Sequence, residues 1–244
     1  MADTSRVSRE KPQGAADAAE ASNRGGRYGE QYSIPAGLPR QALADEGSYF
    51  VAVNATPGTA IAVTGTITTF TDLGTTCGAL FLKNTESKTA SFPKRIYLDY
   101  IKLICLTAPT SAVHWCYAIV MDDNPVRLTS GGTALVCNNV NMDSSVLSIA
   151  SGSFGALVIA AAQNRRMIAR GNLKGTIPVL YDVFYIVAGQ PGVSNTTVTT
   201  ENGVFVESCP PIILGPQQNL LLSMWGVSNN AASTWEHEIG WWER

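Results

Sequence analysis

The segment Ser233–Arg244, S-T-W-E-H-E-I-G-W-W-E-R, constrains the fold more than any other part of the chain. Its side chains alternate, with one set on each side of an extended backbone: Trp235, His237, Ile239 and Trp241 against Glu236, Glu238 and Trp242. A period of two that is rich in aromatic residues is typical of a half-buried β-strand. The segment therefore predicts a half-buried strand built into a β-sheet.

Short runs of strand-forming residues recur from Tyr49 onward, between clusters of turn-forming residues and without a sustained amphipathic helix. The runs are Tyr49–Val53, Ala60–Phe70, Ala79–Lys83, Arg95–Leu106, Val113–Met121, Phe154–Ala162, Arg165–Leu173, Val179–Ala188, Gly203–Glu207, Asn219–Val227 and Thr234–Trp242. This spacing predicts an all-β domain, an antiparallel β-sandwich.

Details of the pairing follow from the spacing of these runs. Arg95–Leu106 and Val113–Met121 are expected to form one hairpin, and Phe154–Ala162 and Arg165–Leu173 another. Within the first run, a strict period of two places five side chains on one side of the strand: Ile96, Leu98, Tyr100, Lys102 and Ile104. The segment 144–150 fits either a short strand or a helical turn.

Among sandwiches, the segment Cys209–Leu222 favours a jelly roll. It has one apolar run, a Gly-Pro turn and a second apolar run, and Pro210 and Pro211 cannot donate hydrogen bonds to a neighbouring strand. Such prolines belong at the start or edge of a strand, and an edge strand that turns into a central one is common in double-sheet β-rolls. A hairpin in another kind of sandwich fits the same pattern.

The first 43 residues differ from the rest, so we expect an extended N-terminal arm (1–43) and one domain (44–244). The arm has few large apolar side chains, and its six basic residues nearly balance five acidic ones. It cannot bury enough surface to offset its ordering entropy alone. Fully extended, 43 residues reach roughly 140 Å at about 3.3 Å each, which is enough to cross a neighbouring subunit.

The chain carries little that could support catalysis or cofactor binding. It has two histidines, His114 and His237, whereas a zinc site needs three or four suitably spaced ligands. The five cysteines are Cys77, Cys105, Cys116, Cys137 and Cys209; their odd number and apolar surroundings indicate buried free thiols in a reducing compartment. We therefore expect no enzyme activity, no cofactor and no metal.

Charge and hydropathy also argue against two classes of partner. The net charge is −2, and the basic cluster Arg165, Arg166 and Arg170 is too small for a nucleic-acid footprint, so it indicates a sheet edge protected by charge. No apolar run reaches 18 residues, and no hydrophobic signal segment follows the first residues. Direct binding of nucleic acid or membrane is not expected.

Only 15% of the residues are charged, below the roughly 25% of ordinary soluble domains. This composition fits either a surface that partly faces other protein or an ordinary β-protein surface rich in Thr and Ser. Aromatic and apolar anchors are the best candidates for such an interface, because indole and phenol rings supply large contact areas. The candidates are Tyr28, Tyr32, Ile34 and Leu38 in the arm and Trp235, Trp241 and Trp242 in the last strand. Sugar stacking would use the same tryptophans, and burial of both strand faces by the sandwich is the simpler alternative.

In four short stretches the chain resembles virion structural proteins of tailed bacteriophages, of the small jelly-roll head-decoration or minor-capsid type. The stretches are Ala44–Ala52 (A-D-E-G-S-Y-F-V-A), Thr56–Thr59 (T-P-G-T), Arg95–Leu103 (R-I-Y-L-D-Y-I-K-L) and Gly240–Arg244 (G-W-W-E-R). They lie within 44–244 and do not cover the arm. None is a site motif, so no functional residue is carried over from the family.

The resemblance implies a non-enzymatic β-sandwich that forms homo-oligomers, commonly trimers, and binds other capsid proteins on the exterior of a virion assembled in the host cytoplasm. The arm would then contact neighbouring subunits. Three other functions stay open: a tail or receptor-binding component that binds glycan through a Trp-rich face, a principal jelly-roll capsid subunit, and a non-viral carbohydrate-binding module.

Overall fold

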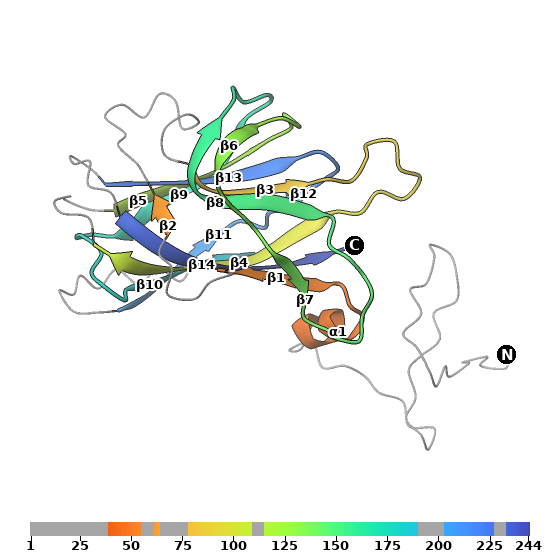
Figure 1. Cartoon of the computed structure of the whole chain (residues 1–244), viewed down its shortest axis with the longest axis horizontal. Helices are drawn as coiled ribbons and strands as arrows, with labels where there is room; N and C mark the ends of the chain where they lie inside the picture. Colours follow the sequence, from red (N-terminus) through yellow and green to blue (C-terminus); the bar gives the residue numbers. More distant parts are fainter. Residues whose placement is uncertain (1–38, 55–60, 64–77, 109–114, 190–202, 227–232) are drawn as a thin grey trace, which may run out of the picture.

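A computed structural model of the chain describes residues 39–54, 61–63, 78–108, 115–189, 203–226 and 233–244 (Figure 1). Two β-sheets pack face to face in this part of the chain, and one short helix, α1 (Pro39–Asp45), lies on the outer side of one of them. The predicted all-β sandwich is therefore confirmed. Its strand pairs are antiparallel except for one parallel pair, β10 with β11.

The larger sheet has eight strands. Six form the continuous order β11 (Val204–Cys209), β10 (Val183–Ala188), β4 (Ile96–Thr107), β14 (Ser233–Glu243), β1 (Tyr49–Val53) and β7 (Cys137–Asn139). Two short strands attach beside this path: β12 (Ile213–Leu214) pairs with β4, and β2 (Ile61–Val63) pairs with β14.

The smaller sheet has six strands. Their order is β6 (Leu128–Ala134), β8 (Ala150–Ile159), β3 (Gly78–Asn84), β13 (Asn219–Gly226), β5 (Trp115–Asp122) and β9 (Arg166–Lys174). The chain passes from β6 in this sheet to β7 in the other and back to β8. One side of the sandwich is thereby closed by the chain itself.

Four antiparallel pairs are nested in the sequence, so that each pair encloses the next one along the chain. They are β1 with β14, β3 with β13, β4 with β10, and β5 with β9. Two further pairs, β14 with β4 and β13 with β5, join these into the two sheets. The two predicted hairpins are wrong. β4 and β5 lie in different sheets, and β9 pairs with β5 while β8 pairs with β3 and β6.

The core lies between the sheets and is aromatic. Trp115 stacks on Trp235 with ring centroids 6.0 Å apart, and Phe50 stacks on Trp241 at 6.2 Å. The predicted alternation of the last strand is confirmed, since Trp235, His237, Ile239 and Trp241 are all buried. At about 25 cal/mol per Å² of apolar surface, such large rings contribute much of the stability of the fold.

A β-bulge in β4 explains one failure of the sequence prediction. Gly240 pairs with Tyr100 while the next residue, Trp241, pairs with Leu98, so Asp99 is an extra residue without a partner on β14. A bulge shifts the alternation by one residue. Ile96 and Leu98 therefore face the core, whereas Tyr100, Lys102 and Ile104, which were expected on the same side, face outward.

The outer face of the smaller sheet is covered by apolar contacts. Phe81 and Leu221 point away from the main core and pack with Leu157 and Ile159 of β8 into a buried cluster. Strand alternation puts Leu157 and Ile159 on this side, because they lie three and five residues after Phe154, which faces the core. A second buried cluster on the same face holds Cys116, Ala118, Val120 and Trp225.

Two fully buried ion pairs fix loop connections. Lys174 Nζ lies 2.6 Å from Asp182 Oδ2, and Asp182 also accepts hydrogen bonds from the backbone N–H groups of Val179 and Gly203. Arg127 Nε lies 2.9 Å from Asp122 Oδ2 in the turn after β5. Removing one partner would leave an uncompensated buried charge, which is strongly destabilising.

The last residues of the predicted arm (1–43) contact the sandwich. Helix α1 spans Pro39–Asp45, Leu43 is buried, and Arg40 pairs with Asp99 of β4. The domain therefore begins no later than Arg40, and the first 38 residues lie outside the described part of the chain.

The segment 144–149 forms neither a strand nor a helical turn. Its Ser148 and Ile149 instead donate hydrogen bonds to the Glu243 carboxylate.

Candidate interaction surface

The structure corrects the predicted tryptophan interface. Trp235 and Trp241 are 0% exposed and belong to the core, so neither is available to a partner or to a sugar. Only Trp242 lies outside the core, half-buried on the outer side of β14. The four arm candidates, Tyr28, Tyr32, Ile34 and Leu38, lie outside the described residues.

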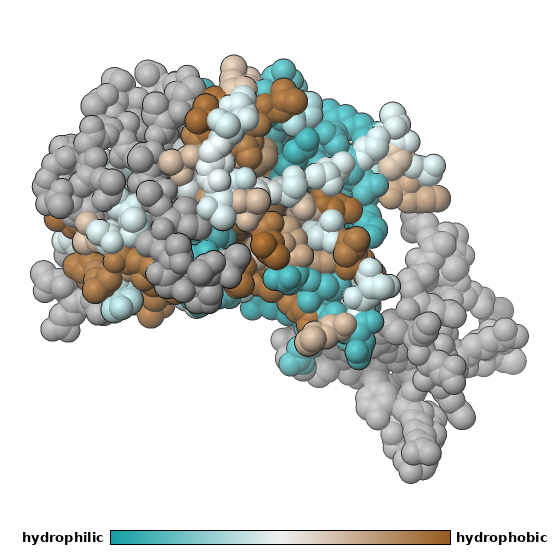
Figure 2. Space-filling view, in the orientation of Figure 1, coloured by the Kyte–Doolittle hydropathy of each residue, from teal (hydrophilic) through white to brown (hydrophobic). Residues whose placement is uncertain are grey.

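Trp242 belongs to a surface that spans the outer side of the eight-stranded sheet, which we call the aromatic face. Its ring-bearing and charged members are half-buried: Tyr97, Tyr100, Lys102, Tyr185, Glu238 and Trp242. Aliphatic residues surround them: Val51, Val53, Ile104, Val183, Val187, Val204 and Val206. Figure 2 shows hydrophobic residues gathered where β4 and β10 end, at one border of this sheet.

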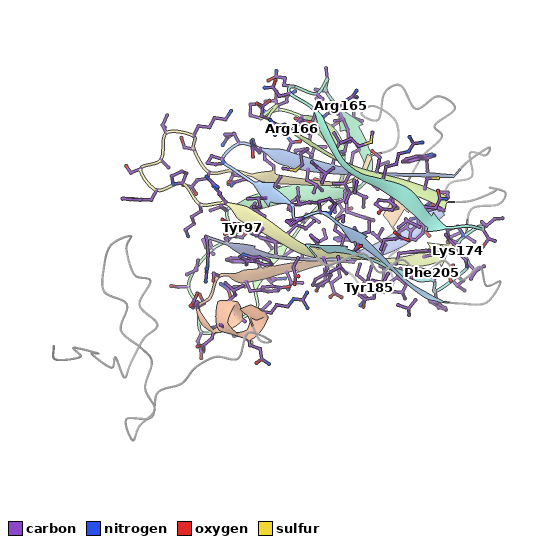
Figure 3. The ribbon with its side chains drawn as sticks, turned by 180° about the vertical axis from the view of Figure 1, so that it is seen from behind. Tyr97, Arg165, Arg166, Lys174, Tyr185 and Phe205 are labelled. Carbon is purple, nitrogen blue, oxygen red and sulfur yellow. The ribbon has the colours of Figure 1, made fainter. Side chains whose placement is uncertain are left out.

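Strand register brings these side chains together. Tyr97 lies opposite Trp242 on β14, and the two rings stack at 5.7 Å with an interplanar angle of 1°. Tyr100 of β4 and Tyr185 of β10 form a second, tilted pair at 6.5 Å. Tyr97 and Tyr185 lie on the same layer of the sandwich, well separated along it (Figure 3). Flat rings held by neighbouring strands form a preorganised contact surface.

Glu238 connects the charged and phenolic groups of the aromatic face. Tyr100 Oη donates to Glu238 Oε1 at 2.6 Å, and Lys102 Nζ lies 3.0 Å from Oε2 and 5.9 Å from the centre of the Tyr185 ring. Burial favours the neutral acid, but the hydrogen bonds from Tyr100 and Lys102 outweigh it and lower the pKa of Glu238. Burial and the hydrogen bond to Glu238 raise the pKa of Tyr100, so its hydroxyl remains a donor.

A small hollow of about 140 Å³ adjoins this cluster. It is lined by Val53, Asn54, Lys102, Ile104, Glu236, His237 and Glu238. Its size suits one side chain of a partner better than a small-molecule ligand, since ligand sites usually measure roughly 300–1,000 Å³.

The bulge residue Asp99 attaches helix α1 to the same face. Arg40 Nη2 donates to Asp99 Oδ1 at 2.7 Å and Arg40 Nε lies 2.6 Å from Oδ2, while Tyr49 Oη donates to Oδ2 at 2.7 Å. Gly240 leaves room for this arrangement, because a Cβ there would lie 2.6 Å from the Tyr49 hydroxyl. The chain before α1 therefore joins the domain at the aromatic face.

Within the described part of the chain, the thiol and imidazole groups lie buried or half-buried and apart from one another. Burial raises the pKa of Cys105 to about 12 and those of Cys137 and Cys209 to about 11, so these thiols stay protonated near neutral pH. His237 is buried against Phe154, with ring centroids 4.4 Å apart, and burial lowers its pKa to about 4. His114 and Cys77 lie outside the described residues, and no group of three metal-ligating side chains occurs within them.

Sequence reasoning missed the aromatic face because it depends on the bulge. The run R-I-Y-L-D-Y-I-K-L contains a usable signal, since Asp99 would be buried among apolar residues if strict alternation held. A lone carboxylate at such a position indicates either a bulge or a buried partner. The partner, Arg40, could not be identified from sequence because it lies 59 residues away.

No protein-family model, no curated protein and no solved structure matches this chain. Among the described residues, no helix has both the length and the apolar character needed to span a bilayer.

Proposed function

We propose that this chain is a non-enzymatic virion structural protein with a jelly-roll domain that oligomerises and binds or stabilises a phage capsid. The observation that carries the proposal is the nested pairing of eight strands: β1, β3, β4, β5, β9, β10, β13 and β14. A folded ribbon of paired strands that rolls into two sheets is the layout of a jelly roll, which viral capsid proteins use often. The other six described strands are then insertions: β2, β7, β11 and β12 in the larger sheet, and β6 and β8 in the smaller one.

The fold alone does not establish function, since lectins and cupins share it. The aromatic face supports an assembly role, because its half-buried rings and valines form an interface-like surface on the outer side of one sheet. Helix α1 is attached there through Arg40 and Asp99, so residues 1–38 join the domain beside this face. We infer that this arm reaches a neighbouring subunit, as its length of roughly 125 Å when extended allows.

The strand pairing supports a principal shell subunit as much as a decoration protein. Particle mass distinguishes them: a decoration protein that self-associates elutes as a small oligomer, and a shell subunit forms large closed particles. A glycan-binding tail component that uses a Trp-rich face loses its main support, because Trp235 and Trp241 are buried in the core.

A matched pair of valines tests the proposed interface. Val204 on β11 of the larger sheet is 56% exposed, and Val158 on β8 of the smaller sheet is 55% exposed. We expect V204D to weaken self-association about tenfold or more, because an unpaired carboxylate resists burial, and V158D to leave it unchanged. Multi-angle light scattering after size-exclusion chromatography measures the association. A monomeric wild-type protein, or equal effects of the two variants, would contradict the proposal.

Deleting residues 1–38 tests the arm. Because α1 is retained, we expect the melting temperature to stay within a few degrees, while subunit association or capsid binding is lost. A truncated protein that assembles like the full chain would show that the arm has no role in assembly.

A further inference from the structure

A second hollow lies away from the aromatic face, where β5 ends and β9 begins. It measures about 480 Å³ and is lined by Met121, Asp122, Asp123, Asn164, Arg165, Arg166, Ile213 and Gln218. This volume falls within the range of roughly 300–1,000 Å³ that is typical of small-molecule sites. Neither the strand pairing nor the aromatic face accounts for it.

Two arginines make the hollow attractive to anions. Arg165 and Arg166 lie at the start of β9, away from Lys174 at the other end of that strand (Figure 3). Within the described residues Arg166 is exposed and forms no ion pair. Asp122 does not offset this charge, because its carboxylate is buried and occupied by Arg127 and Asn219. An arginine fork binds a carboxylate through two parallel hydrogen bonds.

The remaining lining groups suit a ligand with many hydroxyl groups. Asn164 Nδ2 donates to Asp123 Oδ2 at 2.8 Å, which orients the amide at the hollow, and Asn164 has a left-handed φ of +49°. Gln218 is held in place through its Oε1, which accepts from the Gly215 N–H at 2.8 Å. Met121 and Ile213 add a small apolar area beside these planar polar groups.

A residue with a left-handed φ that is also tied down by a side-chain hydrogen bond indicates a local geometry that the surrounding structure maintains. Planar amides, carboxylates and guanidinium groups are the side chains that can hydrogen-bond two neighbouring hydroxyls of one ring. Arg165 and Arg166 outnumber Asp123, the charged lining residue that remains besides the paired Asp122, so the hollow keeps a preference for negative charge.

We propose that this hollow is a binding site for an acidic saccharide of the uronate class. The carboxylate would pair with Arg166, and the ring hydroxyls would bind Asp123, Asn164 and Gln218. This site does not depend on the proposed assembly role, since its residues are distinct from the aromatic face and from the arm.

Titration of the full-length protein with trigalacturonate, followed by calorimetry or by NMR, tests the site. The neutral trisaccharide maltotriose and sodium phosphate serve as comparison ligands at equal ionic strength. We expect binding of trigalacturonate, at least tenfold weaker binding of maltotriose, and no displacement by phosphate at equimolar concentration. Equal binding of the neutral sugar, full displacement by phosphate, or no binding of any of the three would overturn the proposal.

Two variants with the same loss of charge locate the interaction. R166A should weaken trigalacturonate binding about tenfold or more, because a bidentate, charge-assisted contact is lost. R170A removes an arginine four residues further along the same strand, outside the hollow, and should change binding less than twofold. Arg166 and Arg170 are both exposed, so R166A should keep the wild-type melting temperature. Equal weakening by both variants would indicate general electrostatic attraction and would refute a site at this hollow.

Discussion

The outer faces of the two sheets differ in how far the chain covers them. On the six-stranded sheet, Phe81, Leu221 and Trp225 are at most 3% exposed. Side chains of β8 pack on Phe81 and Leu221, and side chains of β5 pack with Trp225. On the eight-stranded sheet, Tyr97, Tyr100 and Trp242 stay half-buried, and α1 covers only one corner. The apolar residues on the outer face of the six-stranded sheet are thus buried within the chain. The outer face of the eight-stranded sheet keeps exposed apolar area that a second chain could cover.

The largest expected effect tests whether the covered face belongs to the folding core. We expect F81A to lower the free energy of unfolding by about 3–5 kcal/mol, since it removes a buried ring and leaves a cavity. Y97A on the aromatic face should cost only about 1 kcal/mol, the value of a half-exposed ring pair. Urea denaturation measures both, and similar losses would mean that the two faces do not differ.

The stability of the fold should decrease in acid because of His237, which lies in the core between the two sheets. Its pKa falls from 6.5 to about 4 because burial disfavours the imidazolium form. The unfolded chain therefore binds the proton first, and stability is lost as the pH falls from about 6.5 towards 4, by up to about 3 kcal/mol.

The variant H237F keeps the ring stacked on Phe154 and removes the titration. Between pH 7 and pH 4 we expect the wild-type protein to lose about 3 kcal/mol more than this variant in urea denaturation. Parallel pH profiles for the two proteins would exclude His237 as the cause.

The attachment of α1 to the aromatic face should have an intermediate effect. D99A leaves the buried Tyr49 hydroxyl without its acceptor and Arg40 without its partner, at a cost of about 2 kcal/mol. R40A should cost less than about 1 kcal/mol, because the Arg40 side chain is 55% exposed and its pair is screened by water. Thermal unfolding of both variants checks the order, and a larger loss for R40A would contradict it.

The smallest effect concerns the ion pair on the aromatic face. Lys102 and Glu238 are 24% and 31% exposed, so a double-mutant cycle with K102A and E238A should give a coupling of less than about 1 kcal/mol. The same pair should matter more in the assembled protein, where the partner excludes water. A coupling that does not change between monomer and oligomer would place these residues outside the interface.

Sequence patterns predicted individual strands well where the alternation was unbroken. β1 spans the predicted Tyr49–Val53 without change, and β14 begins and ends one residue beyond the predicted range. Prediction failed for β6 and β7, which no predicted run covers, because edge strands with exposed polar residues and glycines carry little hydrophobic pattern. It also failed for pairing, since hairpins were assumed between runs that are adjacent in sequence.

The candidate site was the least predictable part. Tryptophans attract attention as interface residues, yet Trp235 and Trp241 fill the core, and the outward positions belong to Tyr97, Tyr100 and Tyr185. The hollow near Arg166 joins the ends of β5 and β9 to the β12–β13 turn, and these segments are far apart in the chain. Spacing within one strand cannot reveal a site assembled from several.

The sequence by itself determined that this chain forms a β-sandwich, because period-two burial and turn residues are local properties that each segment carries alone. The tertiary structure decided which strands pair, which face is covered and which residues remain for a partner. These outcomes depend on contacts between distant residues, such as Arg40 with Asp99, and on one bulge that reverses the outward side of β4. A shift of a single residue changes the face of every following side chain, and that shift is fixed only when the strands meet.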